Sequence, residues 1–222
     1  MASKPLIEDY LNKEDIEALK EWMSGVLATK KRCNTLIAIR NKLPHFVKCD
    51  PNTIVYRGVN IQDTTSFLRD LVSGKATTGN TSICASWSLD AAIAREFTIN
   101  WAQQSSSSIL GIVMARKIKN DCILSVEELS QFDWTNYNKN VWRQVKDFGL
   151  HKEVLLQNTN FIVFDDIIEY EFHDIWGLGR DLFDRYIEEI ADHYDGFGSG
   201  IKYLRLGRNL ARGSKFRIYF VR

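Results

Sequence analysis

Apolar and polar positions alternate with helical spacing at the beginning of the chain. In residues 14–27 (EDIEALKEWMSGVL), apolar side chains such as Ile16, Leu19 and Met23 recur every three or four positions. This spacing gathers apolar side chains on one face of a helix. Residues 33–43 (CNTLIAIRNKL) predict a second helix, so the first part of the chain is expected to be helical.

From residue 53 onward the pattern changes to short apolar runs rich in β-branched residues, which are typical of strands. Strands are predicted at 53–58, 82–88, 108–118, 122–126, 153–157, 160–172 and 213–222, with helices at 63–74, 89–102 and 179–196. The order predicts an α+β fold, with helices in front of a strand-rich body. No linker indicates a split of the 222 residues into separate domains.

Composition narrows the classes of partner only modestly. The net charge is +1, so global charge predicts neither a nucleic-acid nor a membrane partner. No apolar run approaches the roughly 18 residues of a membrane helix, and the start of the chain lacks the apolar core of a secretory signal. The four cysteines form no CxxC pair, which favours reduced thiols in a cytosol and predicts no metal site.

Three short stretches carry candidate chemistry. Arg57 ends a predicted buried strand, where its planar fork suits a diphosphate or carboxylate ligand, or a surface acid. Gly58 would let a ligand approach the backbone, or would turn the chain. Ser86 and Ser88 share one strand face before a helix, and helix capping explains Ser88 better than Ser86. Glu153 opens an apolar strand, where glutamate is depleted.

Taken in order, these stretches resemble the Arg-Ser-Glu signature of mono-ADP-ribosyltransferases. The motifs are YRG at 56–58, SWS at 86–88 and HKE at 151–153, the last followed by the apolar strand VLLQ. The family includes bacterial toxins, phage proteins and eukaryotic relatives, and the resemblance covers residues 53–165. It implies one domain over residues 1–222. The N-terminal helical part would span residues 1–50, and a catalytic core with a split mixed β-sheet would span residues 51–222.

The resemblance implies that NAD is the substrate and that no metal takes part. Arg57 would hold the NAD phosphates, and the backbone at Gly58 would clamp the nicotinamide amide. Ser86 would order the site near the catalytic carboxylate, and Ser88 would support the strand. Phe97 stands where relatives place an aromatic side chain that packs on nicotinamide. The arginine that often follows this aromatic residue in relatives is missing here.

Glu153 would be the catalytic carboxylate. Breaking the bond between nicotinamide and ribose builds an oxocarbenium-like cation, as glycoside hydrolysis does, and a fixed carboxylate stabilises that charge. His151 is predicted to lie on the same strand face, two residues earlier. Relatives carry Glu or Gln there to orient the acceptor. A histidine could act as a base near neutral pH, or it could be the polar start of a strand. Arginine specificity is therefore not implied.

Two further segments bear on the acceptor. Residues 131–149 hold several aromatic side chains, which would be exposed recognition anchors or core residues. The core is favoured for at least one of Trp134 and Trp142. Residues 201–222 carry lysines, arginines and tyrosines but no acid. They could meet an acidic protein or RNA, or form the solvated face of strands, and the net charge favours a protein acceptor over nucleic acid.

The resulting expectation is an enzyme that transfers ADP-ribose from NAD to a macromolecule. Its site of action would be the cytoplasm, including that of a host cell if the protein is an effector or a phage-encoded modifier. Two alternatives stay open: an NAD glycohydrolase that depletes NAD, and a binding module that keeps the fold without turnover. Arg57, Ser86 and Glu153 argue against the module, whereas His151 keeps the glycohydrolase open.

Overall fold

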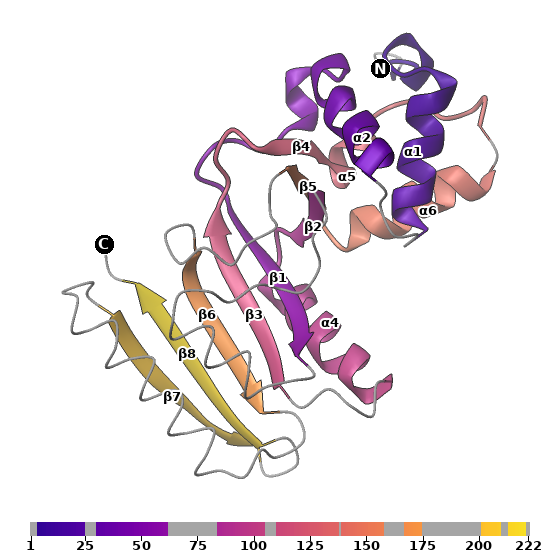
Figure 1. Cartoon of the computed structure of the whole chain (residues 1–222). Helices are drawn as coiled ribbons and strands as arrows, with labels where there is room; N and C mark the ends of the chain where they lie inside the picture. The colour runs from indigo at the N-terminus through magenta and orange to yellow at the C-terminus, as the bar shows by residue number, and fades with distance from the viewer. Residues whose placement is uncertain are drawn as a thin grey trace. The chain divides into compact units, whose positions relative to one another are not determined.

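The computed structural model describes residues 4–24, 30–61, 84–104, 110–137, 139–157, 167–174, 201–209 and 213–220. These residues form an α+β protein, as predicted (Figure 1). The helices expected at 63–74 and 179–196 lie outside the described residues, as does the beginning of the strand expected at 160–172.

The bounds of most predicted elements are confirmed to within a few residues. The helices are α1 (Lys13–Met23), α2 (Lys30–Lys42), α4 (Ala91–Gln104), α5 (Val126–Leu129) and α6 (Lys139–Leu150), with short 3-10 turns η1 (Ile7–Asp9) and η2 (His45–Val47). The strands are β1 (Ile54–Ile61), β2 (Cys84–Ser88), β3 (Leu110–Lys117), β4 (Cys122–Ser125), β5 (Glu153–Gln157), β6 (Ile167–Asp174), β7 (Ile201–Asn209) and β8 (Gly213–Phe220).

The chain divides into two compact units, each built from separate stretches of sequence. Unit 1 comprises Met1–Val55, Asn80–Asp90 and Ile118–Asn160, and unit 2 comprises Tyr56–Gly79, Ala91–Lys117 and Phe161–Arg222. The N-terminal helices therefore share a unit with β2, β4 and β5.

In unit 1, β5 pairs in antiparallel fashion with β4 on one side and with β2 on the other. Helices α2, α5 and α6 contact these short strands, and α1 packs on α2 and α6 (Figure 1). The apolar faces meet in one core, whose largest fully buried members are Phe132, Ile7, Leu11, Leu19, Leu36 and Ile39. Burial of this apolar surface is the main force that holds the helices against the strands.

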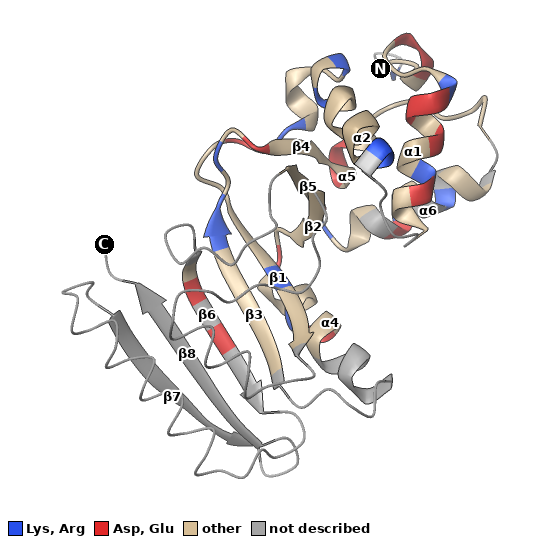
Figure 2. Cartoon of the chain, viewed as in Figure 1, with Lys and Arg blue, Asp and Glu red and all other residues tan. Residues whose placement is uncertain are grey.

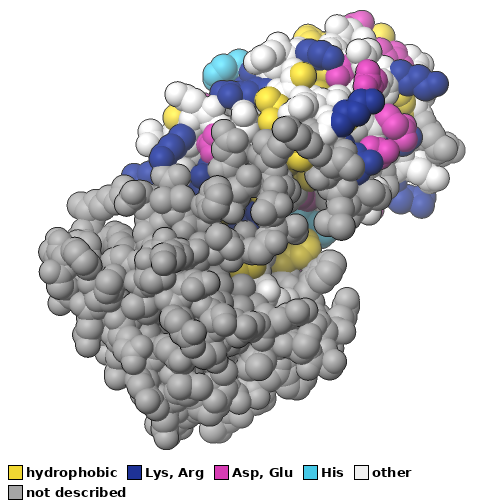
Figure 3. All heavy atoms as spheres, viewed as in Figure 1, with side chains coloured by type: hydrophobic (Ala, Val, Ile, Leu, Met, Phe, Trp, Pro, Cys, Tyr) yellow, Lys and Arg dark blue, Asp and Glu magenta, His cyan; other side chains and the backbone are white. Residues whose placement is uncertain are grey.

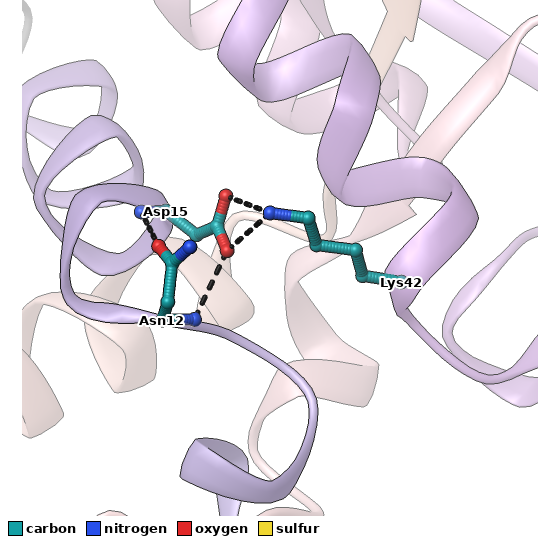
Figure 4. Close-up of polar contacts among 3 residues, drawn as sticks. All are labelled: Asn12, Asp15 and Lys42. Atoms are coloured by element: carbon teal, nitrogen blue, oxygen red, sulfur yellow. Dashed lines mark hydrogen bonds and ion pairs between the residues drawn. The ribbon is translucent and has the colours of Figure 1, made fainter.

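A buried carboxylate fixes the beginning of α1 (Figure 4). The Asn12 side chain accepts from the backbone N–H of Asp15 at 2.9 Å, and the Asp15 carboxylate accepts from the backbone N–H of Asn12 at 3.0 Å. This capping box satisfies amides that the helix leaves unpaired. Lys42, the last residue of α2, lies 2.7 Å from both carboxylate oxygens of Asp15. The buried charge is therefore paired, and α1 is tied to α2.

The aromatic segment before β5 belongs largely to the core of unit 1. Phe132 and Trp134 are buried, and the Trp134 indole donates to the carbonyl of Leu129 at 2.9 Å. Of the two alternatives for this segment, these two side chains take the core position, which confirms the core prediction for at least one of Trp134 and Trp142. Tyr137 is partly buried. The side chains of Trp142 and Phe148 lie outside the described part of the chain.

In unit 2, the strand order is β1-β3-β6-β8-β7, and β3, β6, β8 and β7 pair in antiparallel fashion. Helix α4 packs on β3 and approaches β1 closely. Arg95 of α4 makes a bidentate ion pair with the buried carboxylate of Glu171 on β6, at 2.8 and 3.0 Å. Figure 2 shows the acidic residues on the described part of β6.

Gly58 lies inside β1, so the prediction that the strand ends there is wrong. A Cβ atom added to Gly58 would lie 2.1 Å from the carbonyl oxygen of Ala94 and 2.3 Å from the hydroxyl of Thr98. Both partners belong to α4. Glycine is required here because the helix backbone occupies the space of a side chain.

The surface of unit 1 shows basic and acidic side chains interspersed on the face in view (Figure 3). A mixed surface of this kind creates no extended potential of one sign. Among the described residues, no helix combines the length and apolar character needed to cross a membrane.

Replacing Gly58 with alanine is predicted to destabilise the protein by about 1–3 kcal/mol, since α4 must move away from β1. The control is Gly149→Ala in α6, where the nearest atom to an added Cβ is an ordinary 3.7 Å away. That change should stabilise the helix by up to about 1 kcal/mol. Denaturant unfolding of both variants measures the difference, and equal effects would contradict the packing account.

Candidate active site

The pairing of β2 with β5 brings two serines and a glutamate to one face of unit 1. Ser88 stands opposite Glu153 in the antiparallel register, and Ser86 stands opposite Leu155. Residues two apart on a strand share a face, and directly opposite residues lie on the same face. Ser86 is therefore the diagonal neighbour of Glu153. The strands themselves were predicted, and their register is what the structure adds.

Glu153 is a buried carboxylate, and few polar groups offset the loss of its solvation. Its residue is 8% exposed. Burial raises the pKa of Glu153 from 4.5 to about 7, and a hydrogen bond with the Ser86 side chain only partly offsets this effect. Within the described part of the chain, no lysine, arginine or histidine forms an ion pair with it. Buried acids are normally paired, and perturbed groups of this kind concentrate at functional sites.

Ser86 is held from the other side by a residue that the sequence did not point to. The indole N–H of Trp22, in the last turn of α1, donates to the Ser86 hydroxyl at 3.0 Å. Trp22 is partly buried and packs against the core of unit 1. It lies between Leu19 and Met23 in the sequence, at the border of the apolar stripe, so periodicity alone gives it no special role.

Ser88 connects the ends of the two strands. Its hydroxyl donates to the backbone carbonyl of His151 at 2.9 Å and accepts from the backbone N–H of Asp90 at 3.0 Å. The second bond spans residues i and i+2 in the turn before α4, and it is not an N-cap, because α4 begins at Ala91. Its single hydroxyl proton is used on the His151 carbonyl, so Ser88 joins the end of β2 to the turn before β5.

His151 is not on the strand, so the prediction that it shares a strand face with Glu153 is wrong. Helix α6 ends at Leu150, and His151 and Lys152 form the turn before β5. Lys152 has a φ of 48°, and its N–H donates to the Gly149 carbonyl at 2.9 Å. A left-handed residue of this kind commonly ends a helix. The side chain of His151 is exposed, and its catalytic role stays a prediction.

The other candidate residues lie in unit 2. Arg57 is half-buried on β1, and burial lowers the pKa of its guanidinium. Among the residues that the structure describes, no carboxylate forms an ion pair with it, so the expected pairing with a surface acid is not found. Helix α4 occupies the space that a side chain at Gly58 would need. Phe97 on α4 is 43% exposed, so its ring can meet a ligand.

Unit 1 therefore brings together Ser86, Ser88, Glu153 and, through Ser86, Trp22. No group of three His, Cys, Asp or Glu side chains that could hold a metal is present among the described residues. No protein-family model matches the chain, and no curated protein sequence matches it. The resemblance to ADP-ribosyltransferases therefore depends on the three motifs themselves.

The burial of Glu153 predicts an unusual dependence of stability on pH. Its folded-state pKa is raised, so between pH 4.5 and about 7 the folded protein binds more protons than the unfolded chain. The contribution of Glu153 to stability therefore falls as pH rises through this window, by about 3 kcal/mol. Glu153→Gln removes the ionisation.

The stability of Glu153→Gln relative to the wild type should therefore grow between pH 4.5 and 7.5 and then level off. Denaturant unfolding at a series of pH values measures this difference. A constant difference across the series would show that Glu153 is not desolvated in the folded protein.

Proposed function

We propose that the protein cleaves NAD at the bond between nicotinamide and ribose and transfers ADP-ribose to a macromolecular acceptor. The observation that carries this proposal is the buried, uncompensated carboxylate of Glu153 next to Ser86. An anion desolvated without a counter-charge is poised for a substrate that develops positive charge. The resemblance of the YRG, SWS and HKE motifs to those of ADP-ribosyltransferases names that substrate.

The proposed reaction begins with cleavage of the C–N bond. Its electron pair passes to the pyridinium nitrogen, which leaves as neutral nicotinamide, and the positive charge develops on the ribose C1 and ring oxygen. Ionised Glu153 stabilises this charge through the ribose 2′-hydroxyl, as carboxylates do in glycoside hydrolysis. A lone pair of the acceptor then forms the new bond to C1, and the acceptor's proton is released to a base or to water.

Arg57 is the proposed contact for the diphosphate of NAD. Its guanidinium is half-buried, lacks an ion-pair partner among the described acids, and loses solvation by that burial. The planar fork of arginine can donate two parallel hydrogen bonds to phosphate oxygens. A bound diphosphate would restore the charge balance that burial leaves open.

The acceptor is proposed to be a protein in the cytoplasm, although the interspersed charges on unit 1 do not define its chemistry. All four cysteines are free thiols, which suits a reducing compartment.

NAD glycohydrolase activity is a second candidate function that one observation favours. His151 lies in a turn instead of on the face of Glu153, so the position that orients an acceptor in relatives is not occupied in the expected way. Water would then attack C1 of the ribose. Incubation of a lysate with the protein and labelled NAD separates the candidates, because label appears on a macromolecule or only in free ADP-ribose.

Glu153→Gln is predicted to lower the rate of NAD cleavage on the order of 100-fold or more, with little change in NAD affinity. The carboxylate acts mainly on charge that exists in the transition state. Release of nicotinamide measures the rate, and calorimetry measures the affinity. Near-normal turnover in this variant would remove Glu153 from the catalytic role.

The wild-type kcat/KM should rise with pH up to about 7, where Glu153 ionises in the free protein. The corresponding rise in kcat should lie at lower pH, because the positively charged nicotinamide ring of bound NAD favours the carboxylate. An unchanged kcat/KM across this range would contradict the assignment.

Arg57→Lys is predicted to weaken NAD binding about tenfold or more, since an ammonium ion cannot reproduce the two parallel hydrogen bonds. The matched control is Arg143→Lys on the exposed surface of α6, which should bind NAD like the wild type. Titration calorimetry with NAD compares the two variants. Equal affinities would make Arg57 a structural residue.

A further inference from the structure

The N-terminal helix α1 reaches strand β2 through a polar contact. Trp22 Nε1 lies 3.0 Å from the Ser86 hydroxyl oxygen, although 64 residues separate the two in sequence. Around this contact, Leu19 and Met23 anchor the same helical turn in the core of unit 1. Asp15 and Lys42 fix the other end of α1. The indole is thus held on a rigid element.

The contact constrains where the Ser86 hydroxyl can send its proton. A serine hydroxyl has one proton to donate and two lone pairs that accept. Once a lone pair accepts from the indole N–H, the proton must point away from Trp22. Glu153 is the diagonal neighbour of Ser86 across β2 and β5, and its interaction with the Ser86 side chain lowers the pKa of the Glu153 carboxyl. Linked hydrogen bonds also polarise and strengthen one another.

We propose that Trp22 is a positioning residue, which orients the Ser86 hydroxyl so that it donates to the Glu153 carboxylate. The N-terminal helical part is then a component of the site and not an appendage, although the motif resemblance does not extend to it. The effect on turnover rests on the proposed function, whereas the orientation of Ser86 toward Glu153 does not.

The test compares two variants that each remove one indole N–H. Trp22→Phe removes the donor to Ser86. Trp134→Phe is the matched control, because its indole donates to the Leu129 carbonyl inside the same core. Incorporation of benzothienylalanine at position 22, which keeps the shape of tryptophan without the N–H, serves if phenylalanine disturbs folding.

The first readout needs no NAD. Carboxyl ¹³C resonances of glutamate-labelled protein are titrated with pH, and the Glu153 signal is identified by its loss in Glu153→Gln. Trp22→Phe should raise the midpoint of Glu153 by about half a pH unit or more, the size expected for a weakened hydrogen bond to a carboxylate. Trp134→Phe should leave it unchanged.

A double-variant cycle then identifies the path of the effect. Ser86→Ala should also raise the midpoint, and Trp22→Phe combined with Ser86→Ala should raise it no further than Ser86→Ala alone. A general disturbance of packing would instead add to the effect of Ser86→Ala. Additive shifts, or equal shifts in Trp22→Phe and Trp134→Phe, would overturn the proposal.

The second readout uses NAD and tests the consequence for turnover. Trp22→Phe should lower kcat for NAD cleavage several-fold with little change in KM, because the indole acts through Ser86 and not on the dinucleotide. If the wild type does not cleave NAD, the proposed function fails. The carboxyl titration still decides whether Trp22 orients Ser86. If the titration shifts as expected but kcat does not fall, the effect on turnover is overturned.

Discussion

The desolvated carboxylate of Glu153 is the constraint around which the candidate site is organised. Two acids are buried among the described residues of unit 1, and their surroundings differ. Asp15 has a capping box and the Lys42 ammonium. Glu153 has a serine hydroxyl, and its pKa rises to about 7. In unit 2, buried Glu171 is paired with Arg95. The fold can therefore neutralise a buried acid, and among the buried acids that the structure describes, Glu153 is the one that no lysine, arginine or histidine pairs with.

The elements around Glu153 keep its carboxylate buried. The apolar core of unit 1 carries the helices and the short strands, and its burial offsets the unfavourable desolvation of one carboxylate. Ser88 joins the end of β2 to the turn before β5, so the register that sets Ser86 diagonal to Glu153 is held at the mouth of both strands. The site depends on strand pairing, on α1 and on the end of α6 at once.

Much of this fold follows from local sequence pattern, because apolar periodicity and turn residues act over a few positions. The strands that carry Arg57, Ser86 and Glu153 were predicted for this reason. Helix α6 was missed, although Val141 and Val145 lie one helical turn apart on its buried face. Missing it led to the wrong placement of His151, since a left-handed helix end at Lys152 has no signature without the helix. The contact of Trp22 with Ser86 spans 64 residues and has no local pattern at all.

The discontinuous make-up of unit 1 affects how the protein is made. Its first stretch ends at Val55, yet the strand β5 that completes the unit extends to Gln157. At the usual speed of translation, on the order of 10 s or more passes between the synthesis of these two points. During that interval the core of unit 1 lacks the members that are made later, such as Ile123, Leu129 and Leu155. Unit 1 therefore acquires β5, the strand that carries Glu153, only near the end of its own synthesis.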